Sequence, residues 1–138
     1  MRSLLFPLLL AGAAAGAQTP AAPAAHPLAG RWGWTLPGTA CTETLEYRAN
    51  GTQASRSGDQ ATQSRYTVAR VPSVPGFYRL TETVLESNHA PDCAGDLREP
   101  GDAPTTRFLQ FSPRQDQLLV CREESLKACF GPLRRAPG

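Results

Sequence analysis

Hydrophobic and polar residues alternate along most of the chain from Leu28 onward. A period of two is typical of β-strands that bury one face and expose the other. Within residues 31–36, for example, Trp32, Trp34 and Leu36 fall on one side of the strand. No stretch shows the helical period, so the pattern predicts an all-β domain.

Turn signals divide this pattern into eight predicted strands. Asn50-Gly51 favours a tight hairpin, because both central positions of that turn need positive φ. Residues 88–104 are too rich in Gly, Pro and Asp for a strand and predict an irregular loop. The predicted strands cover residues 31–36, 41–49, 52–57, 64–71, 77–87, 107–111, 117–122 and 128–133.

Seven or eight sequential strands with short connections predict an antiparallel up-and-down meander. Such a meander usually closes into a barrel, since closure removes the exposed strand edges. A β-sandwich is the alternative, but a sandwich needs crossover connections, and only residues 88–104 are long enough to make one. We therefore expect a closed barrel.

The first residues have the three-part pattern of a secretory signal. Arg2 precedes an uncharged apolar run, residues 4–15, which ends in the small residues Ala15-Gly16-Ala17. The run is about twelve residues long, whereas a membrane-spanning helix needs roughly twenty. We expect residues 1–17 to be removed, with cleavage after Ala15 or within residues 21–25 as alternatives, and no membrane anchor to remain.

Composition sets the expected boundaries of the remaining chain. Residues 18–28 are almost wholly Ala and Pro and predict a disordered arm. Residues 29–133 form one predicted barrel domain, which suits this length. Residues 134–138 are expected to be a flexible tail.

Charge and residue usage narrow the range of partners. Without Arg2 the chain carries 13 basic and 12 acidic residues, and they are interspersed. Nucleic acid would require a basic face, so it is not an expected partner. Lys127 is the only lysine among 14 basic residues, and Ala and Pro are abundant, which is typical of a bacterium with a GC-rich genome. We expect a periplasmic or secreted monomer.

The chain has four cysteines, all beyond the predicted signal, and an even number in an oxidising compartment predicts two disulfides. Three pairings are possible. We favour Cys121 with Cys129, which are close in sequence, and Cys41 with Cys93. A redox pair would need Cys-x-x-Cys and a structural zinc site would need paired short spacings, and the sequence has neither.

Two resemblances suggest families. Gly30-Arg31-Trp32, which opens the first strand, resembles the Gly-x-Trp motif of lipocalin-like barrels. That resemblance implies a barrel floor closed by Trp32 beneath a late arginine, for which the candidates are Arg122, Arg134 and Arg135. It also implies a non-enzymatic carrier of a small apolar ligand.

The longer segment 28–34, Leu-Ala-Gly-Arg-Trp-Gly-Trp, followed closely by Cys41, resembles the start of small periplasmic inhibitors of serralysin-type metalloproteases. Those proteins are eight-stranded barrels whose N-terminal arm is thought to enter the protease cleft. This resemblance implies an inhibitor of a protease or another exported hydrolase, which would act through the arm and the rim loops.

Seven side chains on the apolar parity of their strands are the predicted ligand-binding residues. Rings at such positions either line a cavity or fill the core. Inward carboxylates either orient a ligand or act as an acid and base pair. No nucleophile, phosphate-loop or zinc-protease motif is present, so we predict no catalytic residue and no cofactor. The seven are Trp32, Trp34, Glu43, Tyr47, Tyr66, Tyr78 and Glu82.

The loop 88–104 concentrates residues that can bind metals: His89, Asp92, Cys93, Asp96 and Asp102. His with carboxylates can hold a divalent ion. Pro and Gly are interspersed among them, however, and this favours ordinary turn chemistry in a loop anchored by a disulfide. We expect no metal site there, and we regard the loop as the best surface for contact with a partner.

Overall fold

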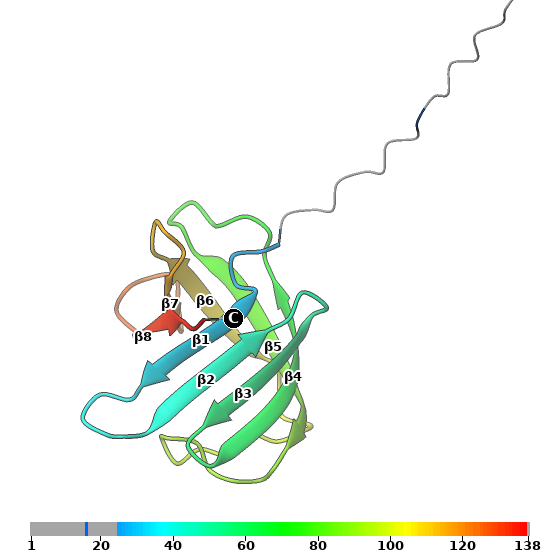
Figure 1. The fold of residues 1–138 in the computed structure, drawn as a ribbon, viewed down its shortest axis with the longest axis vertical. Coiled ribbons are helices and arrows are strands. Elements are labelled where there is room, and N and C mark those ends of the chain that lie inside the picture. Colours follow the sequence, from blue (N-terminus) through cyan, green and yellow to red (C-terminus); the bar gives the residue numbers. More distant parts are fainter. Residues whose placement is uncertain (1–15, 17–24, 138) are drawn as a thin grey trace, which may run out of the picture.

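The computed structural model describes residue 16 and residues 25–137, and its eight strands close into one antiparallel barrel (Figure 1). Each strand pairs with its neighbours in sequence, and β8 returns to β1 through the pairs Trp32 with Arg135 and Gly33 with Arg134. The strands are β1 (Gly30–Thr35), β2 (Thr42–Tyr47), β3 (Thr52–Ser57), β4 (Gln60–Val68), β5 (Tyr78–Ser87), β6 (Thr105–Phe111), β7 (Gln117–Cys121) and β8 (Cys129–Arg135).

The all-β, up-and-down barrel predicted from the alternating pattern is therefore confirmed. In the described part of the chain there is no helix that is long and apolar enough to span a membrane. The largest difference from the predicted strands is at β4, which begins at Gln60 rather than at residue 64. Gly58 and Asp59 form a tight turn, so the hydrogen-bonded pairing of β3 with β4 begins directly beside it, with Ser57 opposite Gln60.

The two ends of the barrel differ, and we call them the mouth and the floor. The mouth carries the connections 36–41, 58–59, 88–104 and 122–128. The floor carries the connections 48–51, 69–77 and 112–116, together with the segment that enters β1, at the top of Figure 1. The long loop 88–104 thus lies at the opposite end of the barrel from the chain's entry.

The floor is closed around Trp32, which is fully buried. Its indole N–H donates to the carbonyl of Leu28 at 2.9 Å, and the Arg135 guanidinium lies 4.2 Å from the centre of its ring. Arg135 also donates to the carbonyls of Pro27 and Ala29. Of the three arginines considered for this position, Arg135 occupies it.

Glycine is required at position 30 by the same contact. Gly30 has a φ of +125°, and a Cβ at this position would lie 2.7 Å from Nη1 of Arg135. An L-residue would be strained in that conformation and would displace the guanidinium. The absence of a side chain at Gly30 therefore leaves space for Arg135 to lie over Trp32.

The floor also corrects the expected domain boundaries. Leu28 is fully buried and belongs to the barrel rather than to an arm, and β8 continues to Arg135 rather than ending at residue 133. His26 is fixed as well, since its Nε2 lies 3.0 Å from the Ala69 carbonyl and its Nδ1 accepts the N–H of Leu28. The predicted signal, apart from residue 16, and residues 18–24 of the arm lie outside the described residues.

Two disulfides join Cys41 to Cys93 and Cys121 to Cys129, as the sequence led us to expect. Both are at the mouth: the first ties the β1–β2 connection to the long loop, and the second closes the β7–β8 connection. No cysteine in the described residues is free. Such full pairing indicates an oxidising environment.

Candidate functional site

The barrel interior is packed near the floor and open toward the mouth. Next to the floor, a buried apolar core holds Leu28, Trp32, Tyr47, Leu80, Leu109, Leu118, Val120 and Leu133. Between this core and the mouth lies a cavity of about 700 Å³ that reaches the long loop. Binding pockets for small organic molecules have volumes of roughly 300 Å³ or more, so this space is large enough for a ligand.

One side of the cavity is apolar. Trp34 and Phe130 lie beside each other near the mouth, with ring centres 5.3 Å apart. Leu45, Val84 and Val120 continue the apolar lining toward the core. These side chains give the cavity a surface that favours hydrocarbon or aromatic groups.

The opposite wall is polar and comes from β3 and β4. Alternation in these strands turns short polar side chains inward, and Gln53, Ser55, Ser57 and Gln60 line the cavity. Ser57 donates to Oε1 of Glu43 at 2.7 Å, and Gln60 donates to two carbonyls of the long loop. The two residues of this wall nearest the mouth, Ser57 and Gln60, therefore already have hydrogen-bond partners within the protein.

Deeper in the barrel, β3 and β4 hold buried polar groups without partners. Gln53 is fully buried, and neither its amide nitrogen nor its amide oxygen has a hydrogen-bond partner. The hydroxyls of Thr62 and Ser64, next to it on β4, are buried and also unpaired. Buried polar groups in native proteins are nearly always satisfied, so the unpaired amide of Gln53, the one of these residues that lines the cavity, points to a hydrogen bond with a bound molecule.

Glu82 and Tyr47 form the polar contact at the base of the cavity. The Tyr47 hydroxyl donates to Oε1 of Glu82 at 3.0 Å, and both side chains are buried. Burial raises the pKa of Glu82 above its ordinary 4.5, although the charge of Arg98, the Tyr47 hydrogen bond and the charge of Arg107 oppose this. Burial, with the nearby Glu82 charge, raises the pKa of Tyr47 well above 10.0.

Three arginines line the part of the cavity near the mouth: Arg98 of the long loop, Arg107 of β6 and Arg122 just after β7. Burial lowers the pKa of Arg107, the Glu82 charge raises it, and the like charges of Arg122 and Arg98 lower it further. Arg107 therefore lies close enough to Glu82, Arg122 and Arg98 for their charges to act on it.

The long loop covers the mouth and uses its acidic residues for turns. Asp92 accepts the backbone N–H groups of Ala94 and Asp96, and Asp102 accepts that of Glu99. Nδ1 of His89 lies 2.6 Å from a carboxylate oxygen of Glu99. In the described residues, no group of three or more His, Cys, Asp or Glu side chains is placed to hold a metal ion.

Four of the seven predicted ligand-binding residues line the cavity: Trp34, Glu43, Tyr47 and Glu82. The interpretation of Trp32, Tyr66 and Tyr78 as lining residues is wrong, because these rings lie at the floor ends of their strands. The Tyr66 hydroxyl donates to the Arg48 carbonyl at 2.6 Å, and Tyr78 packs edge-on against His26. Strand parity gives the face of a side chain but not its depth in the barrel.

Sequence reasoning missed the polar wall and the arginines. The Asn50-Gly51 turn fixes the register of β3 on β2 and places Gln53 opposite Tyr47. Applied to residues 52–57, that register would have turned Gln53, Ser55 and Ser57 inward. Charged residues are usually exposed, so the sequence gives no signal that Arg98 and Arg107 line the cavity, and Arg122, a candidate for the floor, lies at the mouth instead.

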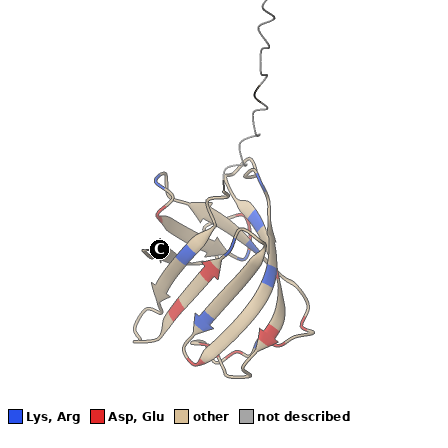
Figure 2. Cartoon of the chain, turned by 45° about the vertical axis from the view of Figure 1, so that its right-hand side comes forward, with Lys and Arg blue, Asp and Glu red and all other residues tan. Residues whose placement is uncertain are grey.

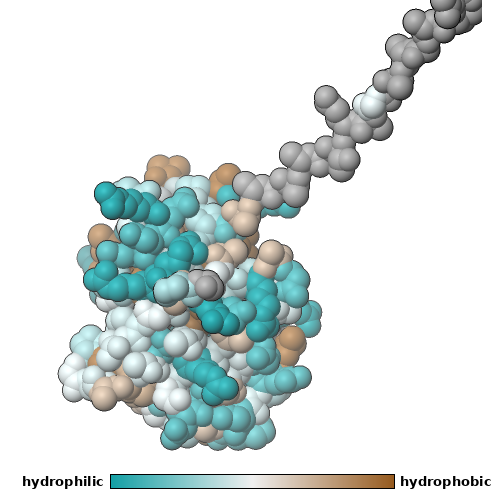
Figure 3. All heavy atoms as spheres, in the orientation of Figure 1, coloured by the Kyte–Doolittle hydropathy of each residue, from teal (hydrophilic) through white to brown (hydrophobic). Residues whose placement is uncertain are grey.

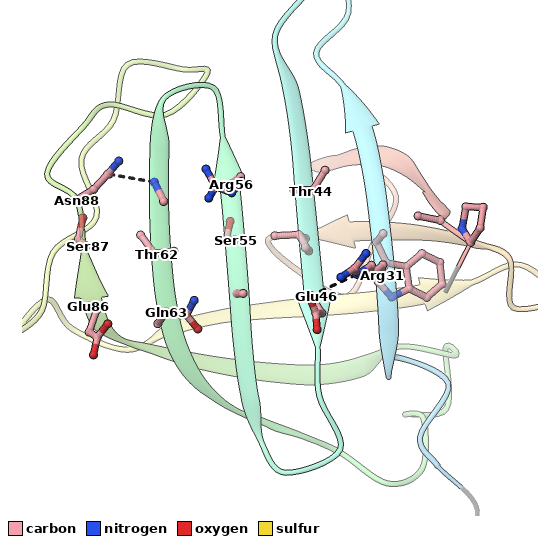
Figure 4. Close-up of a pocket in the computed structure, with 16 residues that line it drawn as sticks. Arg31, Thr44, Glu46, Ser55, Arg56, Thr62, Gln63, Glu86, Ser87 and Asn88 are labelled. Carbon is pink, nitrogen blue, oxygen red and sulfur yellow. Dashed lines mark hydrogen bonds and ion pairs between the residues drawn. The ribbon is translucent and has the colours of Figure 1, made fainter.

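A second hollow, of about 610 Å³, lies on the outer face of β1 to β5 (Figure 4). Short side chains at Thr44, Ala54 and Ala61 leave this space open, and two of its charged residues, Arg31 and Glu46, form an ion pair at 3.4 Å. Figure 2 shows basic and acidic residues interspersed along the strands, and the face in Figure 3 is mostly hydrophilic with scattered hydrophobic residues. The interior cavity is the better candidate site because it lies inside the barrel and its lining includes Gln53, whose buried amide has no partner.

Comparisons with known proteins find no matching family model, no similar curated protein and no similar solved structure.

Proposed function

We propose that this protein is an exported, non-enzymatic binding protein that holds one small amphipathic molecule inside the barrel. The observation that carries the proposal is the cavity of about 700 Å³ bordered by the buried, unpaired amide of Gln53. A barrel selected only for stability would fill this space with apolar side chains. The lipocalin-like resemblance points the same way and is supported by the contact of Arg135 with Trp32.

The two walls indicate what the ligand looks like. Its apolar part would pack against Trp34, Val120 and Phe130, and a hydrogen-bonding edge would face Gln53. Glu43 and Glu82 are engaged by Ser57 and Tyr47, which suits a positioning role better than acid and base catalysis. The paired cysteines and the N-terminal signal pattern support a periplasmic or secreted location in a bacterium.

The alternative function is inhibition of an exported protease through the arm and the rim loops. His26 holds the start of the domain against Ala69 at the floor, whereas the long loop lies at the mouth. An inhibitor that used both the arm and the long loop would need two surfaces at opposite ends of the barrel. We therefore place cavity binding first, and expect that removing residues 18–25 leaves it unchanged.

Titration with N-phenylnaphthylamine, an uncharged probe that fluoresces in apolar surroundings, tests the proposal. The disulfide-bonded protein should bind it, and Ser55→Phe, which fills the cavity from β3, should abolish the signal. Thr44→Phe, on the outer face of β2, is the matched control and should bind normally. Circular dichroism would verify folding, and Ser57→Phe provides a second cavity variant. Equal binding by the cavity variants and the control would contradict the proposal.

A further inference from the structure

Three arginine side chains line the cavity near the mouth. Phe108 and Cys121 are the last pair of the β6–β7 ladder on the mouth side, and Arg107 and Arg122 are the next residues toward the mouth. Arg98 joins them from the long loop, which the Cys41–Cys93 disulfide anchors over the mouth. Cations from three separate elements thus border one space.

These cations are not neutralised within the described residues. The ion pairs there join Arg31 and Arg48 to Glu46 and His89 to Glu99, and none includes Arg98, Arg107 or Arg122. The one hydrogen bond of the Arg107 guanidinium goes to the carbonyl of the preceding residue, at 2.9 Å. Arg107 is partly buried, and although the Glu82 charge favours its charged form, no carboxylate of the described residues lies within ion-pair distance of its guanidinium.

The acidic groups around the cavity form no ion pair with the three arginines, although the charge of Glu82 acts on Arg98 and Arg107. Glu43 accepts from Ser57, Glu82 accepts from Tyr47, and Asp92 and Asp102 accept backbone N–H groups of the loop. Asp96, also on the loop, lies within ion-pair distance of none of the three arginines. The space between Arg98, Arg107 and Arg122 is therefore suited to an anion brought by the ligand.

Building on the proposed binding function, we propose that the ligand carries one acidic group, a carboxylate or a phosphate monoester, held at the mouth by Arg107 and Arg122 and covered by Arg98. Guanidinium groups bind both acids through paired, charge-assisted hydrogen bonds. The apolar part of the ligand would then extend past Trp34 and Phe130 toward the polar wall at Gln53. The ligand would enter tail first, with its acid toward the long loop.

Displacement of N-phenylnaphthylamine by decanoate, decyl phosphate and decanol tests this proposal, because the three compounds share one tail. Either acid should bind about tenfold or more tightly than decanol, as expected for charge-assisted hydrogen bonds. The advantage should shrink as salt is added, since the site is near solvent. The stronger of the two acids identifies the head group, and a preference for either supports the proposal.

Arg107→Gln and Arg122→Gln should each remove most of the preference for an acid while leaving decanol unchanged. Arg122 is exposed, so its variant should fold normally. Arg79→Gln, on the outer face of β5, removes the same charge away from the cavity and should change nothing. Decanol that competes as well as the acids, or arginine variants that weaken decanol equally, would overturn the proposal. Failure of the wild type to bind N-phenylnaphthylamine would instead contradict the proposed function itself.

Discussion

At Gln53 the requirements of stability and of ligand binding differ. The side chain is fully buried and both of its amide atoms are unpaired. A buried polar group without partners costs about 1–3 kcal/mol relative to a satisfied one. We infer that the barrel retains this cost because the amide has a partner when the ligand is bound.

Gln53→Leu should therefore stabilise the free protein. Leucine has a similar volume and no polar atoms, so the free energy of unfolding is expected to rise by about 1 kcal/mol. Urea denaturation followed by circular dichroism measures it. Gln63→Leu, at an exposed position on β4, is the control and should change stability little. A loss of stability in Gln53→Leu would show that the amide is satisfied in the free protein.

Glu82 makes the stability of the barrel depend on pH. Burial raises its folded-state pKa above 4.5, so the folded protein holds the proton more tightly than the unfolded chain. Its contribution to stability is full below pH 4.5 and is lost as the pH rises through the raised folded-state pKa. Glu82→Gln should thus be more stable than the wild type at neutral pH, and the difference should shrink toward pH 4.5.

Unfolding free energies of the wild type and Glu82→Gln, measured across that range, check the sign. Glu86→Gln, four residues along the same strand and exposed, is expected to follow the wild-type profile. A Glu82→Gln variant that is less stable than the wild type at neutral pH would mean that the carboxylate is stabilised in its charged form.

At the scale of single residues, the alternating pattern correctly predicts which side chains of a strand point into the barrel. It turned Glu43, Glu82 and Trp34 inward, and the structure places all three along the cavity. It could not separate Tyr66 and Tyr78, at the floor, from the cavity residues. Depth in a barrel is set by strand register and tilt, which depend on pairings between strands rather than on the sequence of one strand.

At the scale of elements, β3 and β4 explain where the sequence pattern was weakest. Most residues on both faces of this hairpin are polar or small, so the usual contrast between the inside and the outside of a strand is missing. For that reason the pattern predicts a start for β4 at residue 64, four residues after its actual start at Gln60. The same polarity produces the hydrogen-bonding wall of the cavity, so the hardest segment to predict belongs to the candidate site.

The disulfides should contribute unequally to stability. In the chain-entropy model, the 52-residue separation of Cys41 and Cys93 corresponds to about 4 kcal/mol, and the separation of 8 between Cys121 and Cys129 to about 2.5 kcal/mol. The double variant Cys41→Ala with Cys93→Ala should therefore lower Tm more than Cys121→Ala with Cys129→Ala. Thermal denaturation of the two variants measures the order, and the reverse order would contradict this account.

At the scale of the whole molecule, one end of the barrel is closed and the other is covered by a tethered loop. The floor depends on Arg135, which stacks on Trp32 and donates to the carbonyls of Pro27 and Ala29. The mouth depends on the loop 88–104 and its disulfide to Cys41. The cavity lies on the mouth side of the packed core, next to this loop.

Arg135→Lys should weaken the floor although it keeps the charge. Lysine cannot stack on Trp32 and reach both carbonyls, so we expect a loss of about 2 kcal/mol in the free energy of unfolding. Arg134→Lys, its exposed neighbour on β8, is the control. Equal stabilities of the two variants would mean that the cation over Trp32 does not hold the floor together.

The central claim is that the barrel interior is a ligand site, and a crystal structure with N-phenylnaphthylamine bound tests it most directly. The account predicts density for the probe inside the barrel, between Trp34 and the β3 wall at Gln53. Probe bound only in the outer hollow across β1 to β5, with side chains filling the interior, would contradict the account.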